Sequence, residues 1–408
     1  MSGIQGQLLG HLVRRGVEAT TSHLSQSSNS NPAEAWEDLH YQMPSRGISL
    51  MWLTIVSSLF LLASIRYTLG EVVATLAMIE SPSATAYTKI EIRDPGATLE
   101  KEPLIDAEVA LVKQAPITNK IRTAIKHLHR VGGFRARWRG IAVGGIYHLS
   151  HGAISNFFGA MFTNNYRSGP PRPSIMGAVG SIIAAILLSR LHMTWTHVMI
   201  SEPSTKRWWR RIPALPTWKQ VWLPAAVFAA AQQVTVIMPV ILFHALALGD
   251  VDVAKVAADG KTKHACAIVV LKFIAVFALG AMTALCVLLP AAVTLTRIEA
   301  SLLPEEEETI VPFDRTFNGK VVPTALGGTG TVGFVEAWRS FDRAARLRLI
   351  KLYVKIALIQ ITVAIVAMHV VALEIWGIMG DNLGVLIQAG RAQFEQDLRQ
   401  AVAEKKGL

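Results

Sequence analysis

We predict an all-α membrane protein with six transmembrane helices, arranged as three pseudo-repeated helical hairpins with amphipathic surface helices on one basic side. The first observation is a set of six apolar stretches, each long enough to cross a hydrocarbon core of about 30 Å as a helix. The second is that a strongly basic segment lies between the two stretches of every pair. The third is composition, with 51% hydrophobic and 17% charged residues. The six predicted helices are residues 48–80, 140–162, 173–200, 221–248, 266–298 and 353–377.

A large soluble helical protein is the alternative reading of this composition. Soluble domains carry about 25% charged residues, and one soluble core does not hide six long uncharged runs. The polar length that remains is too short for a separate catalytic domain. The composition therefore favours a membrane protein.

The basic residues, which give a net charge of +11, gather in three segments, 113–139, 206–219 and 339–355. If every apolar stretch crosses once, all three segments lie on one side, while the opposite loops, 163–172 and 249–264, are nearly neutral. The positive-inside rule places this basic side in the cytosol or the mitochondrial matrix, with both termini opposite. We expect it to contact anionic lipid headgroups, and nucleic-acid binding is the weaker interpretation.

The apolar pairs divide the chain into repeat 1 (48–165), repeat 2 (166–264) and repeat 3 (265–379). Residues 1–47 form a polar leader that we expect to be largely disordered, since acidic residues interrupt the Arg- and Ser-rich pattern of a mitochondrial presequence. Residues 380–408 alternate charged and apolar positions, which predicts an amphipathic surface helix at the end of the chain.

A short sequence recurs near the end of each odd-numbered apolar stretch, at intervals of about 100 residues. Pro82–Glu91 and Pro290–Glu299 share Pro, Ala, Thr, Ile and Glu, and Arg190–Val198 is a weaker copy. A proline there removes one backbone hydrogen bond and kinks the helix, which allows it to close over a cavity. Basic segments with aromatic residues follow each copy, at 117–140, 206–213 and 334–355, and are typical of helices in the membrane interface.

On these motifs the chain resembles the mitochondrial carrier family over about residues 48–379. Gly133–Gly140 is similar to the family's glycine-led entry into an even-numbered helix. The resemblance implies three repeats, surface helices on the matrix side and a mitochondrial membrane, inner or outer. The residues that would be remnants of the family's signature are Pro82, Thr88, Lys89, Arg190, Thr196, His197, Pro290, Thr296 and Arg297.

The chain also departs from the family's pattern. Carriers place an acid two residues after the proline and a base three further on, so that the repeats form a ring of ion pairs. Here no such pair can form, because the corresponding positions are Ala84 and Tyr87, His192 and Trp195, and Ala292 and Leu295. Two acid-rich insertions, 92–116 and 301–333, follow signatures, and we expect them to fold back onto the basic helices with small energetic effect.

Polar side chains inside the apolar stretches are candidates for function, because their burial in a membrane is expensive. The alternative for each is an interhelical hydrogen bond, or a place near the membrane boundary for Arg66, Lys272 and Glu374. In a carrier-like arrangement the candidate cavity-lining residues are Gln232, Gln233, His244, Lys272, His148 and Gln360, with Arg66, Glu71 and His151 as further intramembrane polar residues.

No pattern in the sequence indicates an enzyme, a cofactor or a metal site. His148 and His151 share a helix face, but no further ligand stands at a suitable spacing. Gly327–Gly330 lacks the lysine of a phosphate loop and reads as a linker. Both cysteines, Cys266 and Cys286, lie in one apolar stretch, so no disulfide framework is encoded.

Two functions follow as hypotheses. The missing ion-pair ring makes the chain similar to carrier relatives of the mitochondrial outer membrane, which also lack intact signatures and work in membrane-protein insertion and fusion. This resemblance implies a membrane scaffold, insertion or fusion protein that does not exchange metabolites, with membrane-protein clients as partners. The alternative is a divergent transporter for a small polar or anionic solute, bound by Gln232, Gln233, His244 and Lys272.

Overall fold

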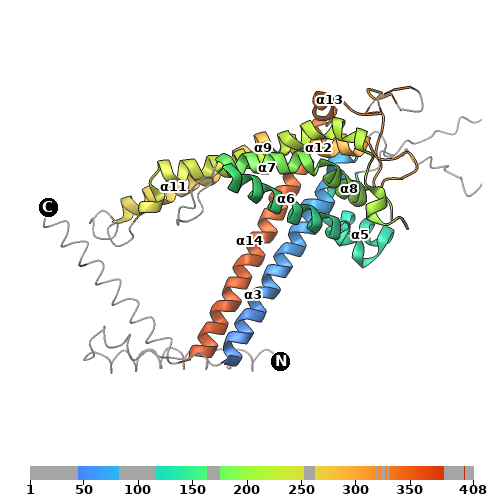
Figure 1. Cartoon of the computed structure of the whole chain (residues 1–408). Helices are drawn as coiled ribbons and strands as arrows, with labels where there is room; N and C mark the ends of the chain where they lie inside the picture. The colour runs from blue at the N-terminus through green and yellow to red at the C-terminus, as the bar shows by residue number, and fades with distance from the viewer. Residues whose placement is uncertain are drawn as a thin grey trace, which may run out of the picture. The chain divides into compact units, whose positions relative to one another are not determined.

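The computed structural model describes residues 45–81, 116–162, 175–251, 262–317, 319–322, 327–328, 330–380 and 399, and its regular elements in these ranges are all helices (Figure 1). The prediction of an all-helical protein is therefore confirmed. The elements are α3 (Ser45–Ile65), η1 (Arg66–Val73), α4 (Ala74–Ile79), η3 (Ile117–Asn119), α5 (Ile121–Gly132), η4 (Phe134–Trp138), α6 (Ile141–Phe162), α7 (Ile175–Leu187), α8 (Ser189–Ile200), η5 (Trp208–Arg211), η6 (Leu215–Thr217), α9 (Trp218–Ala245), η7 (Leu248–Asp250), α11 (Thr262–Thr283), η8 (Ala284–Leu288), α12 (Leu289–Ser301), α13 (Phe334–Arg339) and α14 (Arg343–Met379).

Within the described ranges, four helical segments are long and apolar enough to cross a membrane: Gly47–Ile79, Leu215–Ala245, Cys266–Ser301 and Arg343–Ile378. In the most apolar 18 residues of each segment, between 0% and 11% of the residues are buried within the protein. Soluble proteins rarely leave so much contiguous apolar surface exposed, whereas lipid tails cover it at no cost. The structure thus supports an integral membrane protein.

The two remaining predicted spans differ from simple crossing helices. Residues 173–200 form α7 and α8, which meet at an angle of 63° and make one broken span at most. Helix α6 occupies the stretch predicted at 140–162, but Tyr147, His148, His151 and Asn156 lower its hydropathy and it is not among the four. The described helices therefore provide four candidate spans, or five if the bent pair counts as one. The arrangement of six spans in three repeats stays a prediction.

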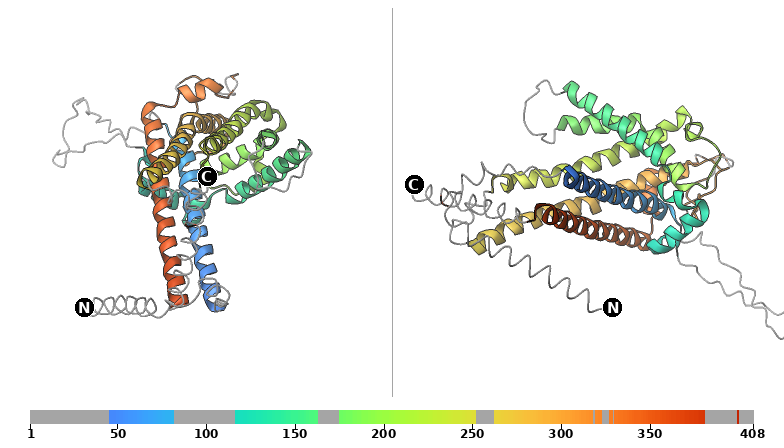
Figure 2. Two further views of the ribbon diagram at one scale, coloured as in Figure 1. Left: turned by 90° about the vertical axis from the view of Figure 1, so that its left-hand side faces the viewer. Right: turned by 90° about the horizontal axis from the view of Figure 1, so that it is seen from below.

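The chain divides into two compact units, and the smaller comprises Met1–Leu62, Leu242–Val276 and Ile361–Leu408. Within it, the first part of α3 and the last part of α14 lie side by side (Figures 1 and 2). Thr54 donates a hydrogen bond to the Glu374 carboxylate across this pair, and Gly47 lies against Ile378. An intramembrane acid is expensive to bury, so its hydrogen bond to Thr54 stabilises this pairing.

The larger unit comprises Ala63–Ile241 and Phe277–Gln360 and holds the main hydrophobic core. Helices α4, α5, α8, α12 and the start of α14 supply this core, whose largest fully buried apolar side chains include Leu76, Ile79, Leu128, Ile200, Phe341, Leu349 and Ile356. Helix α5 buries only Ala124 and Leu128 and exposes its charged residues, which agrees with the predicted amphipathic pattern on the basic side.

Helices α6 and α7 form a closely packed hairpin in the larger unit (Figure 2). Small residues allow the close approach, since a Cβ added at Gly180 would lie 2.6 Å from the Ser155 carbonyl oxygen. His151 Nε2 contacts the Ser181 carbonyl oxygen at 3.1 Å, which adds a polar link between the two helices. Glycine at position 180 is therefore required by a backbone contact that cannot shift easily.

Replacement of Gly180 by valine is expected to lower the free energy of unfolding by about 1–3 kcal/mol relative to Gly152→Val. Both substitutions place a β-branched residue in a helix, but a Cβ at Gly152 would meet nothing within 4 Å. Thermal unfolding of the purified protein in detergent, followed by tryptophan fluorescence, would measure the difference. Equal effects of the two substitutions would contradict the close packing of α6 and α7.

The described part of the acid-rich segment 301–333 folds back at residues 309 and 310 onto the end of α8 and onto the basic helix α5, as predicted. Thr309 forms an isolated antiparallel bridge with Ser201, and the Ile310 amide donates to the Ile200 carbonyl at 2.9 Å. His127 of α5 contacts the Ile310 carbonyl oxygen at 2.8 Å. Backbone hydrogen bonds, and not only surface ion pairs, hold the segment there. Most of the other insertion, together with Pro82, Thr88, Lys89, the leader and nearly all of the tail, lies outside the described residues.

Candidate functional site

The larger unit contains a cavity of about 410 Å³. Each of the four apolar helical segments that could cross a membrane contributes to its wall, as do α6 and α8. The wall mixes apolar residues with side chains that can donate or accept hydrogen bonds: Arg66, Glu71, Thr75, Tyr147, His148, His151, His192, Trp195, Thr196, Gln232, Thr296 and Tyr353. Such a mixture is typical of a site for a small polar molecule.

Two π-helical segments border this cavity. The segment η1 (Arg66–Val73) carries Arg66 and Glu71, and η8 (Ala284–Leu288) contributes Ala284 and Leu288. A π-turn inserts an extra residue in a helix and redirects the side chains near it, which is why such turns are frequent at functional sites. In η1 the redirected residues include a cation and an acid inside an apolar span.

An aromatic cluster forms one wall of the cavity. Trp195 Nε1 donates to the Tyr67 hydroxyl at 3.1 Å, and that hydroxyl donates to the Arg139 carbonyl oxygen at 2.6 Å. The Tyr147 and Trp195 rings stack with centroids 6.0 Å apart. Glycine makes room for this indole, because a Cβ at Gly140, where φ is +71°, would lie 2.9 Å from the Trp195 ring.

The fully buried Glu299 side chain is the centre of a hydrogen-bond network that joins α12 to α8. Its carboxylate contacts His192 Nδ1 at 2.7 Å and accepts from the Thr196 hydroxyl at 2.5 Å. Its backbone oxygen contacts His197 Nε2 at 2.7 Å. A buried acid needs such partners, because an unpaired charge costs several kcal/mol. The residue types at the positions of the carrier family's ion-pair ring cannot pair with one another in this chain. His192, which occupies one of these positions, instead contacts the Glu299 carboxylate, a partner that the sequence did not predict.

The remaining signature remnants in the described residues have structural partners. Arg297, which is buried, donates to the Met78 carbonyl at 3.0 Å and to the Ser340 hydroxyl at 3.1 Å. Arg190 donates through Nε to the Pro213 carbonyl at 3.0 Å, and the Pro290 carbonyl accepts from the Thr294 hydroxyl at 2.8 Å. Arg297 and Arg190 connect helices to each other or to a loop, and neither they nor Pro290 line the cavity, whereas the remnant Thr296 does.

The structure brings some of the predicted cavity residues together and separates others. Gln232 and His148 line the cavity, as do Arg66, Glu71 and His151. Gln233 instead donates to the Ser181 hydroxyl at 3.0 Å, and Gln360 is half-buried but does not line the cavity. His244 and Lys272 belong to the smaller unit, where Lys272 donates to the Leu246 carbonyl at 2.9 Å.

Sequence reasoning missed Tyr147, Tyr353 and Glu299 as members of the site or of its supporting network. Glu299 offered a signal, because an acid at the end of an apolar stretch needs a polar partner. In the sequence it was assigned only to the repeated motif Pro290–Glu299. The aromatic residues gave no signal, since tyrosine and tryptophan are common at membrane boundaries for reasons unrelated to a site.

Among the described residues there is no group of three or more His, Cys, Asp and Glu side chains that could hold a metal ion. Comparison with protein-family models and with curated protein sequences finds no match to this chain.

Proposed function

We propose that this chain is a multi-pass membrane protein of carrier-like fold that binds a small polar or anionic solute in its cavity and moves it across the membrane. The observation that carries this proposal is the cavity of about 410 Å³ to which all four apolar helical segments contribute polar or charged side chains. A membrane span does not need Arg66 or Glu71 for its own stability. Their presence at one wall favours a polar ligand.

The signature threonines support a repeated architecture. Thr196 of α8 and Thr296 of α12 hold corresponding positions in the second and third copies, and both line this cavity. Equivalent residues of pseudo-repeats are expected to face a common axis. We therefore retain the arrangement of three helical hairpins, with six spans, as part of the proposal, and a mitochondrial membrane as its location.

The network around Glu299 would act as the gate on the basic side. Its hydrogen bonds join α8 to α12 where the carrier family uses ion pairs, and a solute could leave on that side only after they separate. Alternating access needs contacts that form in one state and break in the other. A His–Glu contact can serve this purpose without a ring of salt bridges.

Reconstituted vesicles loaded with a panel of radiolabelled metabolites would test the transport proposal. We expect saturable exchange that falls at least about tenfold with Gln232→Ala or His148→Ala, because each removes a hydrogen bond to the solute, worth about 1.5 kcal/mol. Gln233→Ala and His369→Ala are the matched controls, because neither residue lines the cavity. Equal losses in controls and cavity variants would place the solute elsewhere.

The same network around Glu299 favours a second function if its hydrogen bonds between α8 and α12 do not open. A membrane scaffold that takes part in protein insertion or fusion would need a stable helix bundle and no gate. The absence of flux for every solute in the panel, together with cross-links from the purified protein to membrane-protein clients, would support this function over transport.

Fluorescent tagging and protease protection of segment 206–213 would test the mitochondrial location and the orientation.

A further inference from the structure

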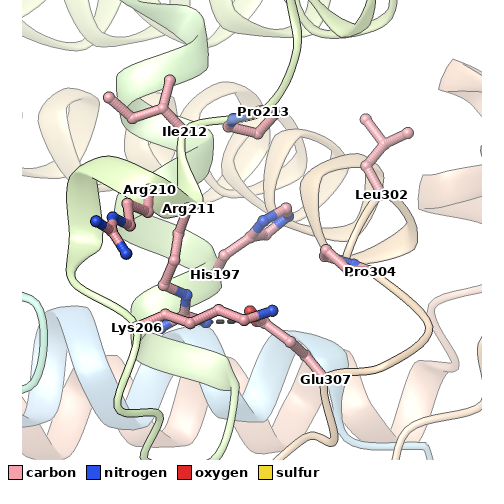
Figure 3. A pocket seen from close by; sticks show the side chains of 9 residues that line it. All are labelled: His197, Lys206, Arg210, Arg211, Ile212, Pro213, Leu302, Pro304 and Glu307. Carbon is pink, nitrogen blue, oxygen red and sulfur yellow. Dashed lines mark hydrogen bonds and ion pairs between the residues drawn. The ribbon is translucent and has the colours of Figure 1, made fainter.

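A second, smaller pocket of about 190 Å³ lies in the larger unit, away from the cavity. Figure 3 shows its wall, which comes from residues 206–213 between α8 and α9, from residues 302–307 after α12, and from His197 of α8. Its volume corresponds to roughly six water molecules. Its lining holds three cations, Lys206, Arg210 and Arg211, and a single acid, Glu307.

Arg211 is the most constrained of these cations, with its side chain only 6% exposed. Its Nη2 donates to the Glu307 carboxylate at 2.5 Å and to the Ser201 hydroxyl at 2.6 Å. Its Nε is buried and has no hydrogen-bond partner within the described part of the chain. A buried donor without an acceptor is destabilising, so Arg211 has unused hydrogen-bonding capacity for an anion.

The lining of the pocket keeps an excess of cations even with Glu307 in place. Arg139 reaches the Ser201 backbone from η4's end, and its pKa is lowered to about 10 by burial and by the nearby Arg211 cation. Lys206 pairs with Glu306 at 3.5 Å, but the Glu306 side chain is 83% exposed, so this contact is weak. Among the residues that line the pocket, the three cations outnumber the one acid.

We propose that this pocket binds a phosphate group, which displaces the Glu307 carboxylate from Arg211. Phosphate oxygens would accept from Arg211 Nε and Nη2 together, a paired geometry that the guanidinium group provides and an ammonium group does not. Lys206 and Arg210 would supply the remaining charge. Glu307 then acts as an internal substitute for the ligand, held in place by the folded-back acidic segment.

The phosphate group can belong to a phospholipid or to a soluble phosphate ester. Exposed apolar side chains on the same chain segment favour a lipid: Trp209 is 48% exposed, Ile212 38% and Leu215 73%. The apolar span Leu215–Ala245 begins at this point, so the pocket lies at the end of a membrane helix, where headgroups and tryptophan side chains gather. The site does not depend on the function proposed for the cavity.

Native mass spectrometry of the full chain in neutral detergent would test the site with two ligands that differ only in the phosphate, dioctanoyl phosphatidic acid and dioctanoylglycerol. We expect the first to bind and the second not to bind. Lys206→Gln with Arg210→Gln should weaken phosphatidic acid binding about thirtyfold, since each cation contributes about 1 kcal/mol. The control is Lys120→Gln with Arg122→Gln, which removes the same charge from the exposed start of α5 and should change binding less than about twofold.

Glu307→Gln provides an independent test, because removal of the competing carboxylate should strengthen phosphatidic acid binding about tenfold. A loss of folding would instead weaken it. Competition by glycerol 3-phosphate at similar concentration would assign the site to soluble phosphate esters, and failure to compete would assign it to lipid. Equal binding of dioctanoylglycerol, or equal effects of the two double substitutions, would overturn the site.

Discussion

Replacement of Glu299 by alanine is expected to lower the free energy of unfolding by about 3–5 kcal/mol. The Glu299 side chain is fully buried and is the hydrogen-bond partner of both His192 and Thr196. Its removal leaves these two polar groups without an acceptor between α8 and α12. The loss therefore combines broken hydrogen bonds, a buried threonine and a part-buried histidine left unpaired, and a small cavity.

Denaturant titration of the purified protein in detergent, with circular dichroism at 222 nm, would measure this effect. Glu306→Ala is the matched control, because the Glu306 side chain is 83% exposed and its loss should cost less than about 0.5 kcal/mol. Glu299→Gln keeps one acceptor and should fall between the two. If Glu299→Ala were as stable as Glu306→Ala, the network would not hold α8 to α12, and its role as a gate would fail too.

Replacement of Arg297 by methionine is expected to cost about 3 kcal/mol. Its guanidinium group donates to Met78 of α4 and to Ser340 after α13, and each hydrogen bond from a charged donor contributes about 1.5–3 kcal/mol. The same group lies over the Phe317 and Phe341 rings, at 4.8 Å and 5.5 Å from their centroids. Methionine preserves much of the volume but none of these contacts.

The control for Arg297→Met is Arg343→Met, since Arg343 is exposed at the start of α14. Arg297→Lys adds information, because lysine keeps the charge but cannot donate to Met78 and Ser340 with the same fork. We expect an intermediate loss of stability, measured by the same titration. A lysine variant as stable as the parent protein would show that charge alone, and not the hydrogen-bond geometry, matters at this position.

The bent helix pair α7–α8 shows where sequence prediction of the fold stops. Hydropathy predicts one helix over 173–200, and the chain is helical on both sides of Leu188, but the two parts meet at 63°. Neither proline nor glycine stands at the break, so no local signal marks it. The bend accompanies contacts with distant residues, such as that of Arg190 with Pro213.

The candidate site shows a similar limit. Gln232 and His148 could be selected from the sequence because they are polar residues in apolar stretches. Gln233 satisfies the same criterion, yet it contacts Ser181 outside the cavity. Adjacent residues on a helix point about 100° apart, so the choice between them depends on which face meets the neighbouring helices.

By itself the sequence determined the helical class, the presence of long apolar segments and the basic segments between them. These are consequences of hydrophobicity, charge and helical period, which act over a few turns of chain. Only the tertiary structure decided that Glu299 meets His192 and Thr196, and that Arg211 meets Glu307, across about 100 residues of chain. Such pairings depend on how helix faces pack, and no local pattern encodes the partner of a buried charge.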